Sequence, residues 1–114
     1  RPRTKKELQV FLVFTDIIRK YFEGEMKGCY TLENLLFKNN ISWSEFLEWE
    51  KEFKNKKWFQ NALMDFKTII KENILNNAKL LGAEIVKILL EDQKEEKELT
   101  IKEYVEIIRN GISA

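Results

Sequence analysis

The sequence contains no histidine, one cysteine, one proline and four glycines among 114 residues. The absence of histidine removes the side chain that most often serves as a general base or a metal ligand. The lone Cys29 cannot form a disulfide within the chain, and a single thiol favours a reducing compartment. We therefore expect no metal, no cofactor and a cytoplasmic location.

Long apolar runs are also missing. The apolar stretch at residues 10–14 lies inside a charged helical pattern and is much shorter than the roughly 18 residues that span a bilayer. No membrane partner is expected. Apolar residues make up 44% of the chain and charged residues 34%, and glycine and proline are too few for the turns of a β-rich fold. This balance predicts an all-α protein.

The first helix is predicted over residues 5–21. Thr4 followed by Glu7 has the pattern of a capping box at its start. Six positions then repeat with the period of a helix: Leu8, Phe11, Leu12, Thr15, Ile18 and Phe22.

A short second helix follows a glycine-containing loop. Thr31 can cap it, and it is expected to end near Asn39. Its inner face carries Leu32, Leu35 and Leu36. Asn39 and Asn40 tolerate the left-handed backbone of a tight turn between helices, so a turn is predicted directly after this helix.

The start of a third helix, over residues 43–53, has the strongest local signals. Ser42 is suited to be its N-cap, and Glu45 completes a capping box. Ile41, just before the cap, can pack against Phe46 as a hydrophobic staple.

A short helix, a tight turn and a capped helix are the parts of a helix-turn-helix, whose second helix enters the major groove of DNA. Periodicity places four positions of the third helix inward: Phe46, Leu47, Trp49 and Glu50. Five others are candidates for DNA contact: Trp43, Ser44, Glu45, Glu48 and Lys51. An ordinary helical corner is the alternative, because this helix has four glutamates and one lysine, and carboxylates repel phosphates.

Two basic clusters are candidates for binding DNA phosphates, since cations near DNA gain free energy by releasing its counterions. The first is Arg1, Arg3, Lys5 and Lys6, and the second is Lys54, Lys56 and Lys57. A solvated basic terminus is the alternative for the first cluster.

A long amphipathic pattern runs from residue 59 to 89, and Asn76, Asn77 or Gly82 could bend or split the helix that it predicts. Six of its apolar residues are expected to pack between helices or between subunits: Phe66, Ile70, Ile74, Leu81, Ile85 and Ile88.

The end of the chain is expected to hold an acidic loop at 91–98 and a last short helix at 101–109. The pattern therefore divides the chain into a helix-turn-helix DNA-binding region, 1–57, and a helical oligomerisation region, 58–114.

No enzyme activity is expected. Ser42 and Ser44 have no candidate base nearby, and the chain has no glycine-rich phosphate loop. Three aromatic residues near helix ends are predicted to be core residues rather than stacking platforms for bases: Trp49, Trp58 and Phe59. Whatever the chain does, it is expected to do by binding.

The run Ile-Ser-Trp-Ser-Glu-Phe-Leu-Glu-Trp at 41–49, followed by Trp58-Phe59 and a long helix, resembles the helix-turn-helix segment of phage terminase small subunits. The family pattern there is Ile-Ser-x-Ser-x-aromatic-x-x-Trp. The basic start at residues 1–3 and the closing helices at 78–90 and 101–109 are similar to that family's basic start and oligomerising end.

The resemblance implies a non-catalytic subunit that assembles into a homo-oligomeric ring. Such a subunit recognises viral double-stranded DNA and passes it to a large ATPase and nuclease subunit. This sequence departs from the family at Trp43, Glu45 and Glu48, where members often carry arginine or lysine, and at Asn40, which replaces the common turn glycine.

Two other functions stay open. A dimeric transcription regulator or transposition protein would use the same motif on a two-fold DNA site. A protein-interaction module would instead bind a protein partner with its acidic third helix and its helical groove, and would not bind DNA.

Overall fold

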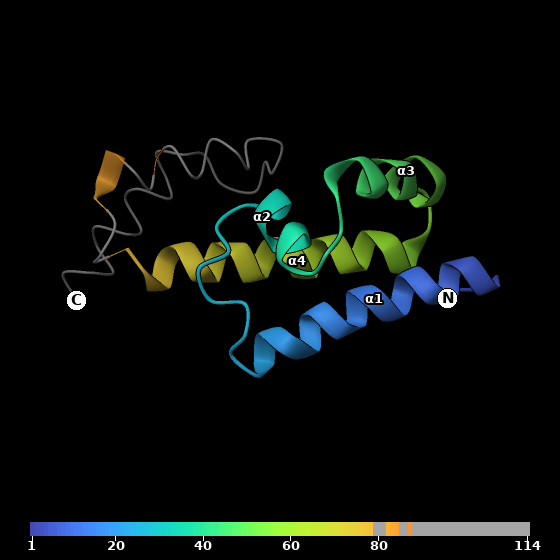
Figure 1. Ribbon diagram of the computed structural model, residues 1–114, viewed down its shortest axis with the longest axis horizontal. Coiled ribbons are helices and arrows are strands. Elements are labelled where there is room, and N and C mark those ends of the chain that lie inside the picture. The colour runs from blue at the N-terminus through green and yellow to red at the C-terminus, as the bar shows by residue number, and fades with distance from the viewer. Residues whose placement is uncertain (79–81, 85–86, 88–114) are drawn as a thin grey trace.

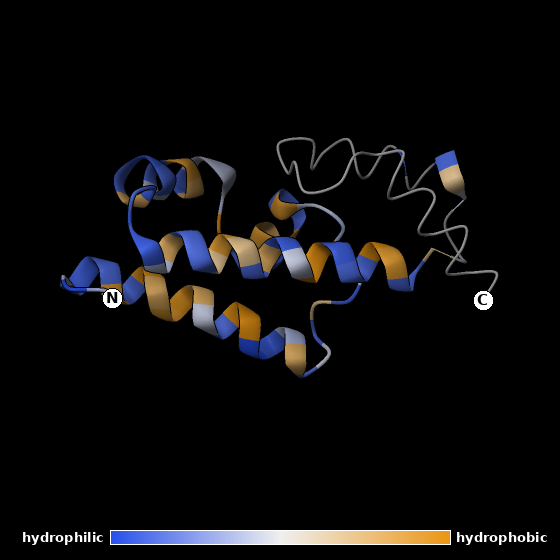
Figure 2. Ribbon diagram, turned by 180° about the vertical axis from the view of Figure 1, so that it is seen from behind, coloured by the Kyte–Doolittle hydropathy of each residue, from blue (hydrophilic) through white to orange (hydrophobic). Residues whose placement is uncertain are grey.

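The computed structural model describes residues 1–78, 82–84 and 87, and this part of the chain is all helical, as predicted (Figure 1). Its helices are α1 (Lys5–Phe22), α2 (Leu32–Lys38), α3 (Trp43–Phe53) and α4 (Lys57–Asn76). α4 lies between α1 on one side and the α2–α3 pair on the other, as Figures 1 and 2 show from opposite directions. None of the described helices combines the length and apolar character needed to cross a membrane.

The predicted helix starts are confirmed by their capping hydrogen bonds. In each of the first three helices, a hydroxyl oxygen before the helix accepts a hydrogen bond from a backbone N–H three residues further on. The pairs are Thr4 with Glu7 at 3.1 Å, Thr31 with Asn34 at 3.0 Å and Ser42 with Glu45 at 3.1 Å.

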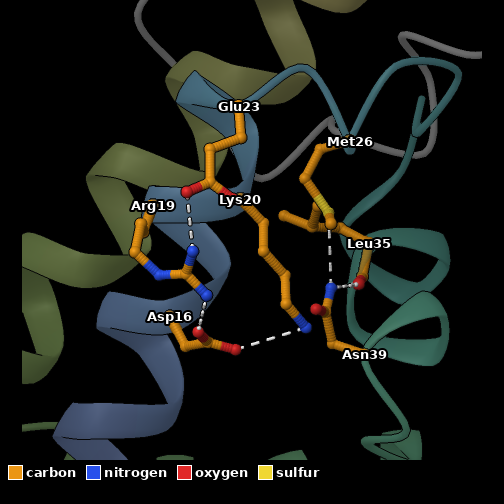
Figure 3. A network of polar contacts seen from close by, with 7 residues as sticks. All are labelled: Asp16, Arg19, Lys20, Glu23, Met26, Leu35 and Asn39. Carbon is orange, nitrogen blue, oxygen red and sulfur yellow. Dashed lines mark hydrogen bonds and ion pairs between the residues drawn. The ribbon is translucent and has the colours of Figure 1, made fainter.

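The turn between α2 and α3 has the predicted left-handed residue. Asn40 has a φ of 63°, a conformation that asparagine tolerates better than most residues. The Asn39 side chain closes α2 by donating to the Leu35 carbonyl at 2.8 Å, and it also reaches the sulfur of Met26 at 3.5 Å (Figure 3). The turn is therefore fixed both to α2 and to the loop before it.

Phe14 is the centre of the aromatic core. Ring centroids of Trp49, Trp58, Phe59 and Phe66 lie 5.7, 6.5, 5.5 and 5.1 Å from that of Phe14. Trp58 and Phe59 are buried and Trp49 is half-buried, which confirms that these aromatics belong to the core. This cluster joins α1, α3 and α4.

A single core crosses the boundary that was expected at residues 57 and 58. Buried side chains from all four helices belong to one cluster, so within the described residues 1–57 and the segment after it do not have separate cores. α4 ends at Asn76, in the asparagine pair that was one of the two sites at which a bend or break was considered, and its 20 residues correspond to about 30 Å. The acidic loop at 91–98 and the last helix at 101–109 lie outside the described residues.

The buried faces of α1 and α3 differ from the expected ones. α1 buries Val10, Phe14 and Ile17, whereas several residues that set its predicted period are exposed. Both sets repeat with a helical period, so periodicity alone did not select the core face. In α3, Leu47 was expected inward but is exposed, because Phe53, seven residues after Phe46, shares its face and points into the core.

Candidate nucleic-acid interface

Two basic clusters that are far apart in the sequence meet at one end of the molecule. The start of α1 lies beside the connection from α3 to α4 in both ribbon views (Figures 1 and 2). An ion pair of 2.7 Å between Lys6 and Glu52 links α1 to the end of α3. We call these residues the basic end, and all of them are exposed: Arg1, Arg3, Lys5, Lys6, Lys54, Lys56 and Lys57.

A buried hydrogen bond holds the basic end together. Glu7 is only 4% exposed, and its Oε2 accepts a hydrogen bond of 3.0 Å from the indole Nε1–H of Trp58. The Thr4 hydroxyl donates to the other carboxylate oxygen at 3.4 Å, and Lys56 Nζ lies 4.0 Å from that oxygen. This group of contacts connects α1, the α3–α4 connection and α4.

The same contacts keep Glu7 ionised. The hydrogen bond from Trp58 is the largest cause that lowers the pKa of Glu7 below its ordinary value, and the charge of Lys56 lowers it further, whereas burial opposes the shift. Sequence reasoning assigned Glu7 only to a capping box and Trp58 only to the core. A buried indole N–H requires an acceptor, but 51 residues separate the two partners and no local pattern connects them.

The exposed face of α3 has the opposite charge. All five of its predicted DNA contacts are exposed: Trp43, Ser44, Glu45, Glu48 and Lys51. Only one of them is basic, and the ring of Trp43 stacks on Phe46 at 5.3 Å rather than standing free. The first residue of α3 is also about 15 Å along the helix axis from its last, at 1.5 Å per residue, so only the last turn adjoins the basic end.

An open groove of about 300 Å³ lies between α2 and the start of α3. Its lining residues are Thr31, Glu33, Asn34, Phe37, Ile41 and Trp43. Phe37 is 77% exposed, which is unusual for such a large apolar side chain. The groove therefore combines a carboxylate with two accessible aromatic rings. No set of three or more metal-binding side chains is clustered anywhere in the described part of the chain.

Cys29 and Asn73 have structural roles at the opposite end of α4. Cys29 is buried, and burial raises the pKa of its thiol. The buried Asn73 side chain donates to the carbonyls of Met26 and Cys29, at 2.8 and 3.1 Å. The sequence analysis missed this buried amide, because an asparagine on an apolar helix face has no distinctive pattern.

Three residues expected in the oligomerisation region lie inside the core of a single chain. Phe66, Ile70 and Ile74 are each 0% exposed, so packing between helices of the same chain accounts for their apolar character. They are not available on the surface for a second subunit. Leu81, Ile85 and Ile88 lie outside the described residues.

The chain matches no protein-family model, and it has no significant match among curated proteins or solved structures.

Proposed function

We propose that this chain is a non-catalytic DNA-binding protein that contacts the phosphates of double-stranded DNA through its basic end. In this proposal it serves as a recognition and assembly subunit of the terminase small-subunit kind. The observation that carries the proposal is the meeting of seven exposed cations from two distant segments near the end of α3, the helix that the sequence predicts to be the second helix of a helix-turn-helix. The packaging role further requires a large subunit to receive the DNA.

Phosphate contact through the basic end has a measurable consequence. Each neutralised phosphate releases counterions, and the logarithm of affinity falls against the logarithm of salt with a slope of about −0.9 per contact. If all seven cations take part, the slope approaches about −6. Because the exposed face of α3 is acid-rich, most of the affinity comes from phosphates and little from base edges. Several linked copies on one DNA would raise the total affinity.

The test is a charge reversal at two exposed lysines. Fluorescence anisotropy with a mixed-sequence duplex of about two helical turns would compare the native chain with the double variant Lys54→Glu and Lys57→Glu. We expect at least tenfold weaker binding near 0.1 M salt and a slope shallower by about two, because two phosphate contacts are lost. The control is the double variant Lys27→Glu and Lys38→Glu, which makes the same charge change at two exposed lysines away from the basic end.

The control separates a local effect from a general one. Equal weakening by the control double variant would mean that only net charge matters, and unchanged binding in the Lys54→Glu and Lys57→Glu variant would remove these two lysines from the site. Native mass spectrometry of the purified chain then distinguishes a closed ring, as in packaging, from the two-fold dimer of a regulator.

A protein-interaction module is a second candidate, which the acid-rich face of α3 and the neighbouring groove favour. Glu33 and the exposed rings of Phe37 and Trp43 suit a cationic side chain of a protein partner. Absence of duplex binding at low salt would support this second function against the first.

A further inference from the structure

One wall of the groove between α2 and α3 is an aromatic ring that the core holds in place. The ring of Trp43 stacks on Phe46, with centroids 5.3 Å apart and planes at 28°, and Phe46 stacks on Phe59, at 6.1 Å and 23°. Phe46 and Phe59 are buried, so this series of nearly parallel rings runs from the core to the surface. Trp43 ends the series at 39% exposure and lines the groove. A planar group bound there would be the next member of the stack.

The other wall of the groove has a second aromatic ring, which is open to a ligand. Phe37 of α2 is 77% exposed and makes no ring contact within the part of the chain that the structure describes. Aromatic faces of this kind attract cations, because the electron density of the ring is negative. Ile41, which is 4% exposed, adds an apolar wall. The groove, of about 300 Å³, therefore suits a ligand of the size of one long side chain.

The charges in and around the groove favour a cation. Glu33 is the one charged residue that lines it, and its carboxylate has no ion-pair partner within the described residues. Residues 31–53, which form α2, the turn and α3, contain five glutamates and two lysines, a net charge of −3. The ion pair of Glu52 with Lys6 at the far end of α3 reduces this excess by one. The surface that remains is still negative, so it attracts cationic groups and repels phosphates.

We propose that this groove binds an arginine side chain of a protein partner, with the guanidinium stacked on Trp43 and paired with Glu33. A guanidinium is planar, so it can extend the stack of rings, whereas the ammonium of lysine cannot. Its N–H groups form a fork that can donate twice to the carboxylate of Glu33. A nucleobase is also planar, but it brings phosphates that the negative surface repels.

This inference rests on the second candidate function, for which it names the ligand, and it does not involve the basic end. The groove lies at the start of α3, whereas the basic end adjoins the last turn of that helix. Contact with a single side chain is small, so we expect a dissociation constant on the order of 0.1–1 mM for one arginine in a short peptide. A partner with further contacts to the acid-rich face of α3 would bind more tightly.

The test is a titration of the full, ¹⁵N-labelled chain, followed by NMR through the indole Nε1–H signal of Trp43. The probe is a short peptide of glycine and serine with blocked ends and one central arginine. Two matched peptides carry lysine, which is charged but not planar, or citrulline, which is planar but uncharged. We expect the arginine peptide to shift the signal, the lysine peptide to bind about threefold more weakly, and the citrulline peptide about tenfold more weakly.

Variants test the two parts of the groove that belong to α2. Phe37→Ala and Glu33→Gln should each weaken binding of the arginine peptide about fivefold. Phe22→Ala and Asp65→Asn are the matched controls, because Phe22 is an 80% exposed ring at the end of α1 and Asp65 is an exposed carboxylate on α4. All four sites are exposed, so the core stays intact. Equal effects of the groove variants and their controls would overturn the inference.

The peptide and DNA results separate this inference from the proposed functions. A lysine peptide that binds as tightly as the arginine peptide would overturn it, but would leave a cationic protein partner standing. Absence of any shift at Trp43 would also overturn it. A short single-stranded thymidine oligonucleotide that shifts Trp43 as strongly as the arginine peptide would assign the groove to nucleic acid instead. Duplex binding that Glu33→Gln leaves unchanged would support the DNA-binding function of the basic end, whichever way the peptides behave.

Discussion

The two ends of the α1–α4 pair are each held by one buried polar side chain, but the two side chains differ in charge. At the basic end, the carboxylate of Glu7 accepts the indole hydrogen of Trp58 at 3.0 Å. At the opposite end, the neutral amide of Asn73 donates to the carbonyls of Met26 and Cys29. The first contact depends on ionisation, and the second has no titrating group.

The buried side chain that carries a charge lies at the end of the molecule where we propose that DNA binds. Glu7 attracts Lys56 and so orders part of the basic end, which a neutral residue at this position would not do. Asn73 instead fixes the loop that returns the chain from α1 to α2, where buried backbone carbonyls need hydrogen-bond donors. Glu7 therefore supports a charged surface at the basic end, and Asn73 supports the conformation of a loop at the opposite end.

The largest expected effect on stability comes from truncating Phe14, which lies between the two ends. Phe14→Ala deletes the ring that α3 and α4 share with α1, and should lower the free energy of unfolding by about 3–5 kcal/mol. Because a chain of this size has only about 5–15 kcal/mol of stability, both ends should loosen together. Urea denaturation measures the loss, and hydrogen exchange at α1 and α4 shows whether both ends open.

Phe37→Ala is the matched control for Phe14→Ala. Phe37 is 77% exposed, so its removal should change stability by no more than about 0.5 kcal/mol. Similar losses in the two variants would mean that Phe14 is not the centre of the core.

The second-largest expected effect on stability comes from changing Asn73, at the end whose buried polar side chain is neutral. Asn73→Leu keeps the branched shape and the number of heavy atoms of the side chain but removes the donor that the carbonyls of Met26 and Cys29 share, which should cost about 1–3 kcal/mol. The loss should be the same at neutral and acid pH, because no group titrates. Asn76→Leu, at an exposed site on the last turn of α4, is the control in urea denaturation. A loss that grows or shrinks with pH would contradict the neutral character of this end.

The local parts of this fold could be predicted from the sequence, whereas its long-range pairs could not. The caps at Thr4, Thr31 and Ser42 and the turn at Asn40 depend on side chains within four residues, so their patterns are visible in the sequence. The pairing of Glu7 with Trp58 depends on tertiary structure alone. The positions of the two basic clusters were predicted, but their meeting at one end depends on how α1 packs against α4.

The face of α1 that enters the core could not be predicted from the sequence either. Both sides of α1 are apolar, and Leu12 fits a helical period as well as Phe14 does. Only the large aromatic partners on α4 decide that Phe14 enters the core. Burial of Phe66 within one chain follows from the same packing, which is why the expected oligomerisation residues of α4 are internal.

The smallest expected effect is a pH dependence confined to the basic end. The pKa of Glu7 in the folded chain is below its ordinary value of 4.5, so its ionised form binds its partners more favourably than its protonated form does. Its contribution to stability is therefore fully present above about pH 4.5 and is lost as the pH falls through the lower, folded-state pKa. Glu7→Gln keeps an oxygen that can accept from Trp58 but has no charge to lose.

Urea midpoints of the native chain and Glu7→Gln, compared from about pH 7 to about pH 3, isolate this charge. The native chain should be the more stable at neutral pH, and the two curves should converge in acid. Asp16→Asn is the control, because the pKa of Asp16 is also lowered, chiefly by hydrogen bonds from Arg19 and then Lys20, but on an exposed surface where such pairs contribute little. A constant difference between Glu7→Gln and the native chain at every pH would mean that Glu7 acts only as a hydrogen-bond acceptor. The basic end would then be as independent of charge as the end that Asn73 holds.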